Sequence, residues 1–115
     1  MSSILKSQSG TLVQASAVLF AALGDQQRLW LVSRLCQGGP RSITQLASGA
    51  RISRQAVTKH LRVMEHAGLV RSSRRGRERI WQLERRRLEE ASRYLNQISA
   101  QWDAALERLR VFVEE

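Results

Sequence analysis

Residues 42 to 83 of this 115-residue chain contain three local patterns in an order that strongly restricts the fold. Ser42 begins an S-x-x-Q capping box that opens a short helix, and Ser53 caps a longer amphipathic helix that ends before Gly68. Two segments of β-type sequence follow, on either side of an arginine-rich turn at residues 74 to 77. We therefore expect a helix, a turn, a second helix and a β-hairpin in one small unit.

The helix after Ser53 is apolar on one side and rich in hydrogen-bond donors on the other. Val57, Leu61 and Met64 lie at i, i+4 and i+7, so they are predicted to face the core. The opposite side carries Arg54, Gln55, Thr58, Lys59 and Arg62. Each of these side chains can donate a hydrogen bond to a base edge or a phosphate. An ordinary surface helix usually mixes in acidic residues, but the first acid here is Glu65, so the pattern favours DNA.

Basic residues are concentrated in the same part of the chain. Residues 41 to 79 contain ten Lys and Arg against two acidic residues, and the whole chain carries a formal charge of +9. A basic block confined to one segment is typical of a surface that binds a polyanion, because each neutralised phosphate releases condensed counterions. A basic surface that is simply solvated is the alternative on charge alone.

The turn of the hairpin combines a glycine with clustered cations. Gly76 supplies the positive φ that a tight hairpin needs. The arginines around it suit phosphate contacts or a narrow minor groove, and they are Arg74, Arg75, Arg77 and Arg79. Together these patterns predict a mainly α-helical winged helix-turn-helix fold with a small β-hairpin wing and the element order α-α-α-α-β-β-α.

The segments before residue 42 are predicted to complete a single domain over residues 11 to 115, after a flexible N-terminus at residues 1 to 10. A first helix is expected over residues 11 to 23, and Asp25 is expected to cap a second helix that ends at residues 38 to 40. Cys36 would lie on the apolar side of that helix together with Leu29 and Val32, as a buried core thiol rather than a redox sensor. A single cysteine fits a reducing compartment, and no segment approaches the roughly 18 apolar residues of a membrane span.

The last helix, expected over residues 87 to 113, carries a continuous apolar stripe at alternating spacings of three and four residues. Such a helix is roughly 40 Å long at 1.5 Å per residue, too long and too apolar to lie bare on so small a domain. We therefore expect a homodimer, with the first helix joining the interface; packing on the chain's own core is the alternative. The central interface residues would be Leu95, Ile98, Trp102 and Leu109.

The chain resembles the arsenic-repressor (ArsR-type) family of winged helix-turn-helix regulators. The stretches that carry the resemblance are Leu23 to Leu29, Ile52 to Val70, and the hairpin with its Arg-Gly-Arg tip and aromatic return strand. Within them, the run S-x-x-x-V-x-K-H-L-R-V-x-E-x-A-G-L-V is highly specific. The likeness implies homodimers that bind inverted-repeat operators, usually as repressors and often with autoregulation.

The resemblance does not extend to a metal site. Metal-sensing members hold cysteines in the third helix or histidine and carboxylate sets in the last, but residues 42 to 49 contain no cysteine and the last helix contains no histidine. His60 and His66 lie six positions apart on different sides of their helix, so they cannot share a metal ion. We therefore expect the branch that does not sense metals, with no metal and no cofactor, and no pattern identifies a small-molecule inducer.

These observations predict a homodimeric, cytoplasmic transcriptional regulator, a repressor, whose partner is a double-stranded DNA operator. The residues expected near base edges are Arg54, Gln55, Thr58 and Lys59, with Gln55 best suited to a bidentate contact with adenine. Those expected on the DNA backbone are Ser53, His60 and Arg62. A basic winged-helix module that binds an acidic protein is the alternative. An enzyme is not expected, because the chain lacks a helix-spaced carboxylate pair, an activated nucleophile and a phosphate-cradling glycine loop.

Overall fold

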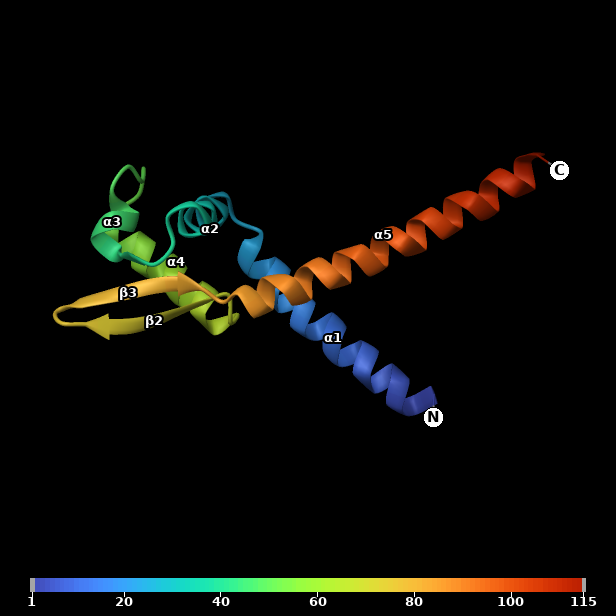
Figure 1. Cartoon of the computed structure of the whole chain (residues 1–115), viewed down its shortest axis with the longest axis horizontal. Coiled ribbons are helices and arrows are strands. Elements are labelled where there is room, and N and C mark those ends of the chain that lie inside the picture. Colours follow the sequence, from blue (N-terminus) through green and yellow to red (C-terminus); the bar gives the residue numbers. More distant parts are fainter. Residues whose placement is uncertain (1, 115) are drawn as a thin grey trace.

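The computed structural model describes residues 2 to 114, and side chains from Val13 to Glu114. The elements in chain order are α1 (Ser2–Leu23), α2 (Gln26–Gly38), β1 (Arg41–Ser42), α3 (Ile43–Ala47), α4 (Arg54–His66), β2 (Val70–Arg75), β3 (Glu78–Leu83) and α5 (Arg85–Glu114). The helices α2, α3 and α4 and the sheet form a small head, from which α1 and α5 extend after crossing each other (Figure 1). The chain is therefore elongated, with extents of 66 × 35 × 20 Å.

The predicted helix starts in the head are confirmed by their side-chain hydrogen bonds. Asp25 accepts two backbone N–H groups at the start of α2, at 2.9 and 3.0 Å. Ser42 and Gln45 form both hydrogen bonds of the capping box at α3. The Ser53 hydroxyl accepts the backbone N–H of Ala56 at the start of α4. These caps satisfy N–H groups that have no partner within the helix.

The hairpin belongs to a three-stranded antiparallel sheet in the order β1-β3-β2. The added strand β1 pairs through Arg41 with Trp81 and through Ser42 with Ile80. A strand of two residues is too short to show alternation, so no sequence pattern predicts it. Gly76 at the tip has a φ of 61°, as predicted. The turn is tighter than expected, because β2 continues to Arg75 and β3 begins at Glu78.

The hydrophobic core lies where α2, α3 and α4 meet the sheet. Val57, Leu61 and Met64 on α4 are fully buried, which confirms the predicted inward face of this helix. Trp81 on β3 is fully buried beside them. Since the apolar side of α4 is fixed in this way, its polar side must point out of the head.

Three details of the sequence interpretation need correction. The first helix begins at Ser2 rather than at Thr11, and residues 2 to 10 are helical. On α2 the buried residues are Leu31 and Leu35, whereas Leu29 is half exposed. Cys36 is exposed, so its assignment as a core thiol is wrong. Residues 29 to 32 are apolar without interruption, and such a run does not reveal which side of a helix faces inward.

The helix α5 packs on the head only through its first turns. Ala91 is buried, and Leu88 lies against the core. Farther along, the ring of Tyr94 lies 6.2 Å from the ring of Phe20 on α1. Beyond this crossing, α5 continues away from the head without another described segment beside it (Figure 1).

Candidate nucleic-acid interface

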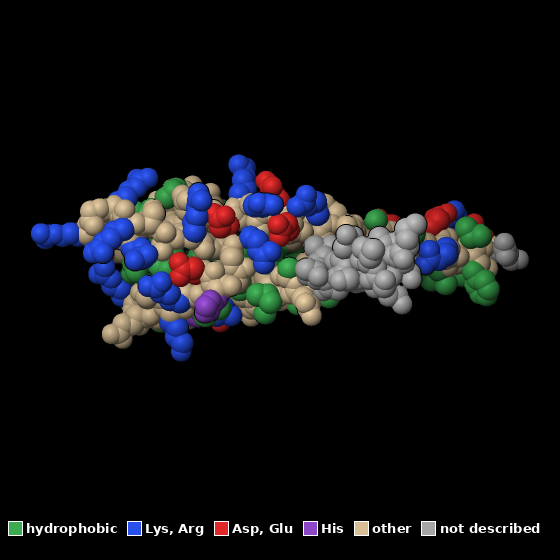
Figure 2. Space-filling view, turned by 90° about the horizontal axis from the view of Figure 1, so that it is seen from below, with side chains coloured by type: hydrophobic (Ala, Val, Ile, Leu, Met, Phe, Trp, Pro, Cys, Tyr) green, Lys and Arg blue, Asp and Glu red, His purple; other side chains and the backbone are tan. Residues whose placement is uncertain are grey.

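The outward side of α4 carries most of the residues predicted to contact DNA. The exposed ones are Ser53, Arg54, Gln55, Lys59 and Arg62. Thr58 and His60 are only partly exposed. In the space-filling view, Lys and Arg side chains gather over the end of the molecule that holds α4 and the wing (Figure 2). A helix of this kind can enter a major groove with its polar side facing the bases.

The two partly exposed residues already have partners within the chain. The Thr58 hydroxyl donates to the backbone oxygen of Arg54 at 3.1 Å. His60 Nε2 lies 2.7 Å from the side-chain oxygen of Gln27, and its Nδ1 lies 3.3 Å from Arg28 Nη1. Because a guanidinium can only donate, Nδ1 accepts from Arg28 and Nε2–H donates to Gln27. His60 therefore ties α4 to the start of α2.

A chain of polar contacts joins the end of α4 to the wing. The Glu65 carboxylate accepts from Arg62 at 3.1 Å and from the Ser72 hydroxyl at 3.3 Å. Ser72 in turn accepts from Arg79 on β3 at 2.9 Å. In the sequence, Glu65 stands out only as the first acid after a basic face. Its i+3 spacing from Arg62 was the available sign of a positioning role.

The wing tip presents free cations. Arg74, Arg75 and Arg77 are exposed, and within residues 13 to 114 they form no ion pair. Arg79 differs, because Ser72 holds it toward α4. Arginines without an acidic partner remain available for phosphate oxygens, which their planar forks bind bidentately.

An uncovered apolar strip follows α5 beyond its crossing with α1. Leu95, Trp102 and Leu109 expose 52%, 64% and 57% of their surface, and Ile98 is partly exposed. Phe112 extends the strip and exposes 76%. Hydrophobic side chains are visible at this far end of the molecule (Figure 2). Strips of this size on a small domain usually mark an interaction surface.

The described residues provide little for other chemistries. Across them, no three His, Cys, Asp or Glu side chains come together as a metal-binding group. No helix in the described range is both long and apolar enough to cross a bilayer.

Comparisons with known proteins agree with this geometry. Residues 23 to 73 match a family model described as a helix-turn-helix domain. The HTH-type transcriptional regulator YuzN of Bacillus subtilis is 37% identical, in a match that covers 54% of this chain and 74% of that protein. The structure of an ArsR-like transcriptional regulator from Rhodococcus sp. RHA1 superimposes with a TM-score of 0.76 at 35% identity, covering 88% of this chain and 93% of that one.

A more distant structure shares the fold. It is the solution NMR structure of a homodimeric winged helix-turn-helix DNA-binding domain from Mycobacterium bovis, a possible ArsR-family regulator. It superimposes with a TM-score of 0.63 at 22% identity, covering 88% of this chain and 90% of that one. The fold and the family are those of DNA-binding regulators rather than of enzymes. This chain therefore belongs to the ArsR-type family of winged helix-turn-helix, DNA-binding transcriptional regulators.

Proposed function

We propose that this regulator is a homodimeric repressor that binds an inverted-repeat operator in the cytoplasm. The observation that carries the proposal is the shared orientation of two basic elements. The exposed polar side of α4 and the unpaired arginines of the wing lie at the same end of the head, opposite the free end of α5 (Figures 1 and 2). One duplex can therefore contact both elements at once.

In this proposal α4 lies in the major groove and reads base edges. Arg54 and Gln55 are exposed in the first turn of α4, which is the end that enters the groove in helix-turn-helix proteins, and Lys59 is exposed in the second turn. Thr58 contributes its methyl group and an acceptor, because its proton is directed to the α4 backbone. Gln55 has the amide geometry for a bidentate contact with adenine.

Other residues on α4 position the helix on the backbone. Ser53, His60 and Arg62 flank the base-reading side. His60 and Arg62 are held by Gln27 and Glu65, respectively, so a phosphate contact by either would be made from a fixed position. Phosphate contacts of this kind set the register of the protein on the duplex but carry little sequence information.

The wing extends the contact beyond the major groove. Arg74, Arg75, Arg77 and Arg79 would bind flanking phosphates or the adjacent minor groove. The first three are free to do so, while Arg79 would act from the position that Ser72 gives it. Their contribution is expected to be affinity rather than sequence preference.

In this proposal the apolar strip of α5 is the surface that binds the second subunit. Leu95, Ile98, Trp102 and Leu109 lie at the spacing that a paired helix buries, and no described segment of the same chain covers them. The M. bovis domain with the same fold is a homodimer. A two-fold axis through this interface would present two copies of α4, which matches an inverted repeat. The family resemblance supports repression.

Sequencing the genomic fragments that the purified protein retains at physiological salt tests this proposal. We expect enrichment of fragments that share an inverted repeat whose half-sites lie roughly 10 to 10.5 base pairs apart, or a multiple of that distance. Fragments without a common motif would contradict it. Retention of an acidic protein with no enriched DNA would instead support the protein-interaction alternative.

A further inference from the structure

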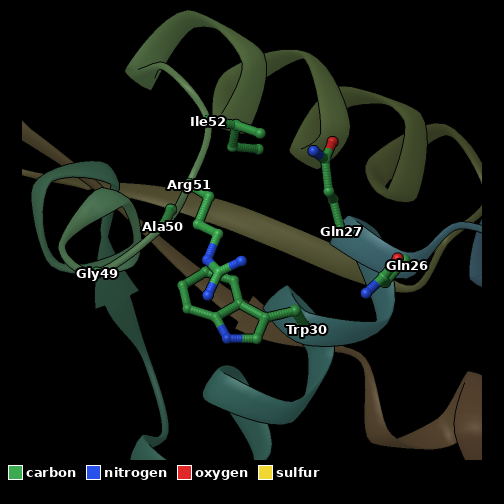
Figure 3. A pocket seen from close by; sticks show the side chains of 7 residues that line it. All are labelled: Gln26, Gln27, Trp30, Gly49, Ala50, Arg51 and Ile52. Atoms are coloured by element: carbon green, nitrogen blue, oxygen red, sulfur yellow. The ribbon is translucent and has the colours of Figure 1, made fainter.

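An open pocket of about 570 Å³ lies between the start of α2 and the turn that precedes α4 (Figure 3). Its walls include Gln26, Gln27 and Trp30 from α2, and Arg51 and Ile52 from the turn. The volume falls in the range of about 300 to 1,000 Å³ that small-molecule sites occupy. The proposed DNA contacts do not use these residues.

The walls combine a flat aromatic surface with positive charge. Trp30 is partly exposed, and Arg34, which is not part of the lining, lies over its ring with the guanidinium carbon 5.0 Å from the ring centroid. The Gln45 carbonyl oxygen holds Arg34 there at 2.9 Å. Arg51 reaches toward the indole from the opposite wall (Figure 3).

Arg51 has no acidic partner. It is exposed, forms no ion pair within residues 13 to 114, and shares the pocket with no Asp or Glu. The neighbouring Asp25 carboxylate is occupied by backbone N–H groups of α2. A free guanidinium and an indole that line one pocket suit a ligand that has both a flat ring and a carboxylate.

We infer that this pocket binds a planar aromatic carboxylate as a regulatory ligand. The carboxylate pairs with Arg51, the ring packs on Trp30 and Ile52, and the Gln26 amide can hydrogen-bond a polar substituent. A neutral molecule of the same shape leaves the charge of Arg51 without a partner and binds more weakly.

The pocket is connected to the DNA-reading helix through one side chain. Gln27 lines the pocket and points toward α4 (Figure 3), where its side-chain oxygen lies 2.7 Å from His60 Nε2. A ring packed on Trp30 occupies the space beside the Gln27 side chain, and so changes how this contact holds α4. Ligand and operator therefore influence each other's affinity by the same factor.

Calorimetric titration of the full chain with sodium 2-naphthoate tests the site. We expect saturable binding with one site per chain, and binding about tenfold weaker for 2-naphthalenemethanol, which has the same rings and no charge. Arg51→Gln should weaken binding by about tenfold, and so should Trp30→Leu. Arg93→Gln removes an exposed charge from α5 and should leave binding unchanged.

Several results would overturn the inference. They are the absence of saturable binding at millimolar naphthoate, equal binding of the neutral analogue, and an unchanged affinity in Arg51→Gln, which alters an exposed side chain. If Arg51→Gln instead weakens operator binding while naphthoate does not bind, the inference is wrong and Arg51 binds a DNA phosphate. The calorimetry does not depend on the proposed repressor function.

The coupling to α4 is tested separately and rests on the proposed function. The naphthoate dissociation constant, measured with and without saturating operator duplex, should differ by about fivefold or more. An unchanged constant would overturn the coupling through Gln27 and His60.

Discussion

The guanidinium of Arg62 on α4 lies over the buried indole of Trp81 on β3, with its carbon 5.6 Å from the ring centroid. Arg62 also forms an ion pair with Glu65. Glu65 accepts a hydrogen bond from Ser72, which accepts one from Arg79. The packing and the polar contacts fix α4 relative to the wing. In the proposed complex, both elements approach a duplex in one geometry but contact different parts of it, so changes in each should have different consequences.

Gln55→Ala should relax sequence discrimination at one base pair in each half-site. Loss of a bidentate base contact costs roughly 1 to 3 kcal/mol of discrimination, while the slope of log Kd against log salt concentration stays the same. Titrations of operators that carry single substitutions measure both quantities. Gln37→Ala, at an exposed position near the end of α2, serves as the control. A Gln55 variant with full base preference would remove this residue from the predicted reading set.

Combined Arg75→Ala and Arg77→Ala changes should weaken binding to every duplex alike. Each lost phosphate contact should also flatten the salt slope by about one unit, because fewer counterions are released. Fluorescence anisotropy over a series of salt concentrations, with operator and scrambled duplexes, provides the measurement. Arg93→Ala removes one exposed charge from α5 and shows the effect of losing a single positive charge outside the wing. An unchanged affinity and slope in the wing variant would mean that the wing does not touch DNA.

Ile98→Glu should dissociate the dimer. The change places an unpaired carboxylate in the apolar strip, at a cost of about 3 to 5 kcal/mol when the group is buried. Light scattering at tens of micromolar protein should show a dimer for the unchanged chain and a monomer for the variant. Gln97→Glu adds the same charge at a neighbouring exposed position and should remain dimeric. A monomeric unchanged chain would contradict the proposed interface.

The acid sensitivity of folding should depend on Asp25. The pKa of its carboxyl group lies below the ordinary value, chiefly because the carboxylate accepts the backbone N–H of Arg28. A depressed folded-state pKa stabilises the fold above the unfolded-state pKa, and this stabilisation is lost as pH falls through the folded-state value. Thermal unfolding from about pH 7 down to about pH 3 should therefore show a smaller acid-induced loss for Asp25→Asn, which keeps a capping side chain without the titration. Parallel curves for the two proteins would show that the Asp25 titration is not linked to folding.

Local signals made most of the DNA-reading unit predictable. The caps at Ser42 and Ser53 and the period of Val57, Leu61 and Met64 are short-range features, and the structure confirms each of them. They determine which side of α4 is buried and therefore which side is exposed.

Features that depend on contacts between distant segments were not predictable in this way. The buried side of α2 is set by how Leu31 and Leu35 meet the rest of the head, not by its uninterrupted apolar run. The contact of His60 with Gln27 joins positions 33 apart in sequence. The pocket beside Trp30 likewise needs Arg51 from another segment, and no periodic pattern connects these residues.

The central claim is that two copies of α4, joined through α5, read the two halves of one operator. Its most direct test compares the affinity for the natural inverted repeat with that for a duplex containing about 5 extra base pairs between the half-sites, which turns one half-site to the opposite face. We predict a loss of roughly 100-fold or more, because only one half-site can then be engaged. Equal affinity for the two duplexes would show that each chain binds alone and would contradict the account.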